Sequence, residues 1–161
     1  MEVLRRKQEL SVGVKILDLD HREMEETISD ICSLVKVEQD RSLTGPLLRK
    51  LAHFTLSHFA LEEEMMTATT YPGLAAHRFN HRCLMGQLGK LIAGHDRGAL
   101  ILDPHSLNFL SKWHSAHILH DDRHYGFWLN RVDRRLEISN KYVENPAHSQ
   151  VLSPLSSGCT S

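Results

Sequence analysis

Three clusters of helix-breaking residues divide the chain into four long segments, and this division constrains the fold more than any other feature. The breaks lie at Thr44-Gly45-Pro46, Tyr71-Pro72-Gly73 and Asp103-Pro104. Proline after a capping threonine or aspartate is typical of the first turn of a helix. The sequence therefore predicts four helices, which cover about residues 18–39, 46–67, 74–93 and 104–132, the first of them capped by Asp18 or Asp20.

The pattern of the segments is helical throughout, since no stretch alternates with a period of two residues. Four helices with short connections predict an all-α, up-down-up-down antiparallel four-helix bundle. We expect the bundle domain to span residues 1–144, with residues 1–16 as an irregular N-terminal arm. Residues 145–161 contain two prolines and several serines and are predicted to form a disordered tail.

The charge balance argues against nucleic acid or an anionic membrane as a partner. Lys and Arg number 19 and Asp and Glu number 20, which gives a net charge of -1, whereas both partners require a basic surplus. No apolar run approaches the about 18 residues of a membrane span. The N-terminus lacks the apolar core of a signal peptide. We therefore expect a cytoplasmic protein, and a monomer.

The chain has twelve histidines but only three cysteines, Cys32, Cys83 and Cys159. The cysteines form no CxxC pair, which argues against a thiolate zinc site and a disulfide framework. A metal bound by this chain would therefore have imidazole and carboxylate ligands.

Histidines and carboxylates recur at helical spacing near one end of the predicted bundle. Each i,i+4 pair taken alone is more typical of a solvated helix face than of a metal site. With helix directions alternating, however, seven groups fall within about 15 Å of the same end. They come from all four helices and are His21, His58, Glu62, His77, His81, His117 and Asp122. Seven ligands suit two ions bridged by the carboxylates, and iron, zinc, copper and manganese all accept such ligands.

The same residues resemble a known family, the hemerythrins, and in particular their bacterial branch. The resemblance covers roughly residues 10–129. Its matching stretches are Val12-Gly13-Val14 with Leu17-Asp18-Leu19-Asp20-His21, His58-Phe59-Ala60-Leu61-Glu62-Glu63, Tyr71-Pro72-Gly73-Leu74 with His77 and His81, and Trp113, His117-Ile118, Asp122 and Tyr125.

The resemblance implies a non-haem diiron centre. His77, His81 and His117 would hold one iron and His21 and His58 the other, with Glu62, Asp122 and an oxo or hydroxo group as bridges. The two-histidine iron would keep an open position for dioxygen. Glu63 and Glu64 would point away from the site. Asp121 fits an ideal helix better, but the family pattern selects Asp122, and a local π-bulge would bring it inward.

The chain departs from the family pattern at residues that bear on oxygen. Arg6 stands where a tryptophan is expected, and Asp20 where a Gln or Glu is common. His114 follows Trp113 where the family places an apolar residue facing the oxygen site, so both are oxygen-pocket candidates. His114 could turn outward to solvent. Facing inward, it would shorten the lifetime of bound oxygen by donating a proton below about pH 6.5. Alternatively, it would occupy the open iron position and block oxygen.

The leading hypothesis is a diiron oxygen-binding protein for storage, delivery or sensing of dioxygen, and not an enzyme. Five neutral imidazoles donate less charge than the carboxylate-rich ligands of diiron oxidases, which favours reversible binding. The alternatives are a diiron peroxidase or oxidase, a nitric oxide scavenger, and an iron-sequestering or purely structural bundle.

Overall fold

The computed structural model describes residues 10–37, 41–100 and 102–131. The predicted tail and Arg6 lie outside these residues, so the domain bounds remain a prediction. Within the described chain every regular element is helical and no strand occurs. The elements are α2 (Lys15–Val37), α3 (Arg41–Ala68), α4 (Leu74–Asp96), α5 (Pro104–His117), a π-helical segment η1 (Ile118–Asp122) and α6 (Arg123–Arg131).

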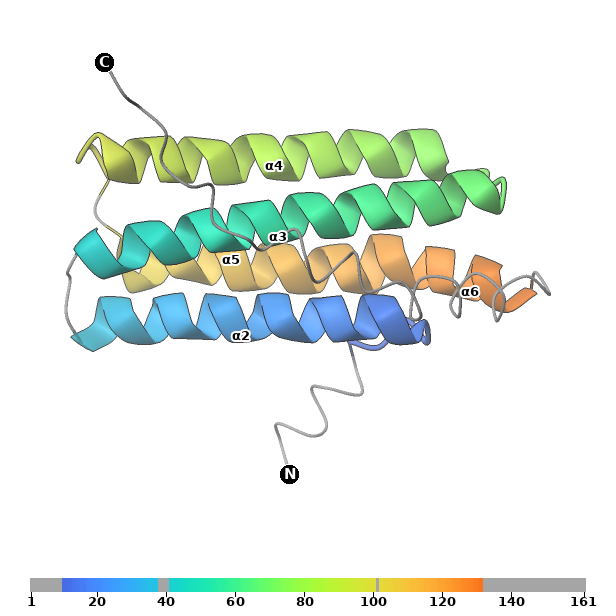
Figure 1. Ribbon diagram of the computed structural model, residues 1–161, viewed down its shortest axis with the longest axis horizontal. Coiled ribbons are helices and arrows are strands. Elements are labelled where there is room, and N and C mark those ends of the chain that lie inside the picture. The colour runs from blue at the N-terminus through green and yellow to red at the C-terminus, as the bar shows by residue number, and fades with distance from the viewer. Residues whose placement is uncertain (1–9, 38–40, 101, 132–161) are drawn as a thin grey trace, which may run out of the picture.

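The helices form the predicted four-helix bundle, with successive helices antiparallel (Figure 1). Helix α3 packs against both α2 and α4, and α5 packs against α2. Segments α5, η1 and α6 follow one another without a break and together make the fourth column of the bundle. No helix in the described ranges is long and apolar enough to cross a membrane. A cytoplasmic location stays a prediction.

Helix α2 begins at Lys15, so the expectation that Asp18 or Asp20 caps its start is wrong. Asp18 lies in the first turn instead, where its carboxylate accepts hydrogen bonds from the Val12 backbone N–H at 2.8 Å and the Ser11 hydroxyl at 2.7 Å. Gly13 has a φ of 75°, a conformation that glycine adopts without strain. Asp18 therefore holds the preceding arm against the helix and does not cap the start of the helix.

Helix α3 begins at Arg41, before the predicted start at Pro46, which lies inside the helix. Proline there removes one helical hydrogen bond. Thr44, the expected cap, is buried and its hydroxyl instead contacts Nε2 of His95 on α4 at 3.0 Å. Helix α4 correspondingly continues past the predicted end at Ala93 to Asp96. Contacts between α3 and α4 thus extend both helices beyond their local sequence signals. The start of α5 at Pro104 is confirmed.

Two apolar clusters fill the bundle interior. The cluster away from the N-terminal arm, here called the distal cluster, contains Met24, Ile28, Ile31 and Val35 from one face of α2. They pack with leucines of α3, α4 and α5. The proximal cluster combines Val12, Val14 and Leu17 with Leu61, Met65, Met66, Ile118, Tyr125 and Leu129. Along each column the histidine-bearing positions fall between or beside the two clusters. The candidate site is therefore a polar layer inside an otherwise apolar bundle.

The N-terminal arm crosses α6 at Gly126, which predicts a large effect of a small substitution. A Cβ at this position would lie 2.3 Å from the backbone oxygen of Val12. Gly126→Ala should therefore displace the arm and lower the free energy of unfolding by about 1–3 kcal/mol. Urea unfolding followed by circular dichroism should show a lower midpoint urea concentration, with an unchanged dependence of the free energy of unfolding on urea concentration.

The matched control is Gly86→Ala on α4, where an added Cβ meets nothing within 4 Å. Alanine at an exposed helical position is favoured over glycine, so the free energy of unfolding of this variant should rise by about 0.5–1 kcal/mol. Equal responses of the two variants would contradict the close approach of the arm to α6.

Candidate metal centre

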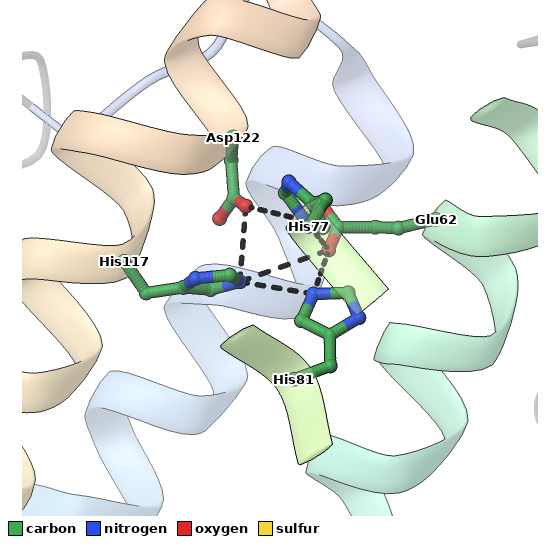
Figure 2. Close-up of side chains that lie close together, drawn as sticks. All are labelled: Glu62, His77, His81, His117 and Asp122. Carbon is green, nitrogen blue, oxygen red and sulfur yellow. Dashed lines mark hydrogen bonds and ion pairs between the residues drawn. The ribbon is translucent and has the colours of Figure 1, made fainter. Parts of the chain in front are cut away.

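The structure brings all seven predicted side chains together, and all seven are buried. They form two overlapping groups, in each of which the potential ligand atoms lie within 4.8 Å of one another. One group contains His77, His81 and His117, the other contains His21 and His58, and both contain Glu62 and Asp122. Figure 2 shows the first group, with side chains from α3, α4, α5 and η1 converging on one point.

The carboxylate of Asp122 faces both groups. Its Oδ1 atom lies 3.1 Å from Nε2 of His117 and 3.4 Å from Nε2 of His77. Its Oδ2 atom lies 3.2 Å from Nε2 of His21. One oxygen thus points to each group, as a carboxylate that bridges two ions requires.

Glu62 likewise lies between the groups. Its Oε2 atom is 3.3 Å from Nε2 of His81, 3.5 Å from Nε2 of His77 and 3.6 Å from Nε2 of His58. The two carboxylates are completely buried. They are the points at which the imidazoles of four helices meet.

The π-helical segment positions Asp122. On a regular α-helix a residue five positions after His117 would lie about 140° around the axis. In η1 the i→i+5 pattern is adopted over Ile118–Asp122, and the N–H of Arg123 bonds to the carbonyl of Ile118. The expected local distortion is confirmed, and it turns Asp122 inward.

Three further carboxylates hold the imidazoles from outside. Asp20 lies 3.1 Å from Nδ1 of His58, Glu63 lies 2.9 Å from Nδ1 of His81, and Asp121 lies 3.0 Å from Nδ1 of His117. Because a carboxylate accepts, each Nδ1 donates its hydrogen and the Nε2 lone pair is left to face the site. This is the usual arrangement around metal-binding histidines.

Sequence reasoning did not assign these outer carboxylates. Glu63 lies outside both ligand groups, as expected, but it contacts one of their imidazoles. Glu63 binds His81 on one side and accepts from Nε of Arg78 at 2.9 Å on the other. A signal was present, because each outer acid is adjacent in sequence to one of the seven residues. Adjacency alone did not reveal which imidazole each would reach across the bundle.

The unpaired atoms of the layer fit two cations. Among the described residues, both carboxylate oxygens of Glu62 and of Asp122 are buried without a hydrogen-bond partner. The same holds for Nε2 of His21, His58 and His77. Buried polar atoms without partners are costly and uncommon. Imidazole nitrogens with carboxylate oxygens are a suitable donor set for iron and for several other transition metals.

Burial sets the protonation of these groups in the direction that metal binding needs. Desolvation lowers the pKa of His77 to about 4 and that of His81 to about 2, and it holds the pKa of His58 well below its usual value. These three imidazoles are therefore neutral, the form that binds metal. Desolvation and the nearby Asp122 raise the pKa of Glu62, an effect that a bound cation would oppose.

Both oxygen-pocket candidates line the interior. Trp113 is buried beside Phe59, whose ring stacks on His81 with centroids 3.6 Å apart. His114 is 4% exposed, and its ring centroid lies 6.0 Å from that of His21. Of the two orientations considered, His114 thus takes the inward one. Desolvation lowers its pKa to about 3, which favours the neutral imidazole.

Comparison with known proteins agrees with this geometry. Residues 12–129 match the family described as the hemerythrin HHE cation binding domain. A bacteriohemerythrin of Stenotrophomonas maltophilia is 29% identical over 125 residues, which cover 78% of this chain and 80% of that protein. A bacteriohemerythrin of Pseudomonas aeruginosa is 25% identical over 119 residues, covering 74% and 76%.

Solved structures give the same result. The crystal structure of a wild-type hemerythrin superposes with a TM-score of 0.67 at 26% identity, covering 70% of this chain and 86% of that one. The family match spans most of the chain and includes every residue of the polar layer. The chain therefore belongs to the hemerythrin family, in its bacterial branch.

Proposed function

We propose that the chain holds two iron ions in the polar layer and binds dioxygen for storage, delivery or sensing. The observation that carries this proposal is the pair of buried carboxylates, Glu62 and Asp122, shared by a group of three imidazoles and a group of two. His77, His81 and His117 would hold one iron, and His21 and His58 the other. When bound, the iron pair would supply the electrons for reversible oxygen binding.

The protein's own contribution is orientation and exclusion of water. Outer carboxylates hold three of the imidazoles with Nε2 toward the layer. The proximal apolar cluster closes one side of the layer and the distal cluster the other. Since the second group offers one imidazole fewer, its ion would keep a position for an external ligand.

A second candidate function is an enzyme on the same scaffold, a diiron peroxidase or oxidase or a nitric oxide scavenger. His114 is the specific observation that favours it. An imidazole, unlike an apolar side chain, can hydrogen-bond a polar molecule on the two-histidine side.

Metal analysis followed by oxygen exposure tests these functions. Protein expressed with ample iron should contain two irons per chain; one zinc and no iron would contradict the proposal. After anaerobic reduction, admission of oxygen should produce a stable spectrum that reverses when oxygen is removed. Rapid decay with turnover of peroxide would favour the enzyme, and iron without any response to oxygen would favour sequestration.

A further inference from the structure

A groove of about 590 Å³ runs between α2 and α5, two helices that pack side by side (Figure 1). We call it the α2–α5 groove; Glu25 and Ser29 line it from α2, and Ser111, Lys112, His114 and Ser115 from α5. Apolar side chains, among them Ile28 and Leu119, line the groove together with these polar groups. The groove is therefore amphipathic, and its polar side chains can hydrogen-bond a small molecule.

His114 forms the inner wall of this groove. Its side chain is almost fully buried, and Nε2 has no hydrogen-bond partner. On its inner side the ring makes an edge contact with His21, one of the two imidazoles of the smaller group. The ring of His114 thus stands between the groove and the two-histidine side of the polar layer.

The stability of the fold does not account for this histidine. A buried polar atom without a partner costs free energy, and an apolar side chain of similar size would avoid that cost. Departures from local stability rules occur mainly at functional sites. The unpartnered nitrogen and the groove beside it are two independent observations that indicate a ligand.

We propose that the α2–α5 groove admits a small hydrogen-bonding inorganic molecule to the two-histidine side of the metal centre, where His114 forms a hydrogen bond to it. This inference rests on the proposed diiron function and adds a selectivity to it. Neutral imidazole offers one N–H donor and one lone pair. It therefore adds a hydrogen bond for small anions and protic molecules at this side of the centre, beside the dioxygen binding proposed above.

Azide binding to the oxidised, iron-loaded protein tests the hydrogen bond. Azide is small, accepts hydrogen bonds, and its binding to iron is followed by charge-transfer absorption. His114→Leu should bind azide about three- to tenfold more weakly, the usual range for one hydrogen bond. His114→Gln keeps an N–H donor and should retain most of the affinity. Equal affinity in the wild type and the leucine variant would overturn the assignment.

Stopped-flow mixing tests the route with two tryptophan substitutions one helical turn apart on α2. Ser29 lines the groove, whereas the exposed Ser33 does not. Ser29→Trp should slow azide association at least about tenfold with an unchanged equilibrium constant, since a blocked path slows entry and exit alike. Ser33→Trp should leave the rate unchanged. Equal rates in both variants and the wild type would exclude this groove as the path.

Thermal unfolding of the metal-free protein separates this inference from the proposed function. Removing an unpartnered buried nitrogen should raise the Tm of His114→Leu above that of the wild type. A lower Tm would mean that His114 is a packed structural residue and would overturn the inference, whether or not iron binds. Failure of the wild type to load iron would count against the diiron function alone.

Discussion

Glu62→Gln is expected to lower the affinity for iron more than any other single change on α3. Glu62 contacts imidazoles of both groups through one buried oxygen, so its loss removes a ligand from both ions. Changes to residues that only support a ligand cost about 10- to 100-fold in metal affinity, and we expect this variant to exceed that range. Iron per chain after loading and desalting measures the effect.

The two following glutamates provide graded controls. Glu63 supports His81 and is itself bonded to Arg78, so Glu63→Gln should lower iron affinity by about 10- to 100-fold. Glu64 is exposed and lies outside both ligand groups, so Glu64→Gln should load iron as the wild type does. Equal losses in all three variants would mean that the ligand face of α3 is wrongly assigned.

A correctly folded variant must be distinguished from a collapsed one. Glu62 is a buried carboxyl whose pKa is raised by desolvation, so a neutral amide of the same shape should not destabilise the metal-free bundle. The Tm of metal-free Glu62→Gln should be equal to or above that of the wild type. A large fall in Tm would attribute the loss of iron to unfolding instead.

Acid is expected to release all bound metal over a narrow pH range. Protons compete with metal for five imidazoles, whose pKa is about 6.5 in an unfolded chain. Because burial lowers the pKa of His77 to about 4 and that of His81 to about 2, the unfolded chain binds more protons between these values and 6.5. The stability of the fold therefore falls as pH drops below about 6.5.

Glu62 acts in the opposite sense in the metal-free state. Its raised pKa lets the folded protein bind an extra proton above the ordinary pKa of a glutamate, and burial likewise raises the pKa of Asp20 to about 6. These two carboxyls oppose four histidines whose pKa is lowered. A chelator assay from pH 7 to pH 3 should show steep release well below 6.5, with reloading after neutralisation. Full retention of iron near pH 3 would contradict imidazole ligation.

The sequence was sufficient for the bundle and for the grouping of the seven side chains. Helical spacing and alternating helix directions place His58, Glu62, His77 and His81 at one level whatever the details of packing. The distortion near Asp122 was expected through the family resemblance, which selects Asp122 over the better-spaced Asp121.

What sequence reasoning missed depends on contacts between helices. Thr44 was expected to cap α3 but bonds to His95 of a neighbouring helix, and the helix starts earlier. Glu63 was expected to have no part in the site, yet it reaches His81 on α4. In both cases a polar side chain had a local and a distant partner available, and only the packed structure decides between them.

The position of the polar layer between two apolar clusters links iron to the cooperativity of unfolding. Without cations, the side chains of the polar layer between the proximal and distal clusters contribute little stabilising interaction. Either end of the bundle can therefore unfold locally while the other stays folded. Two ions held by residues of all four helical columns would cross-link the middle of the bundle. Hydrogen exchange should then show two separate protection levels in the metal-free protein and a single, higher level once iron is bound.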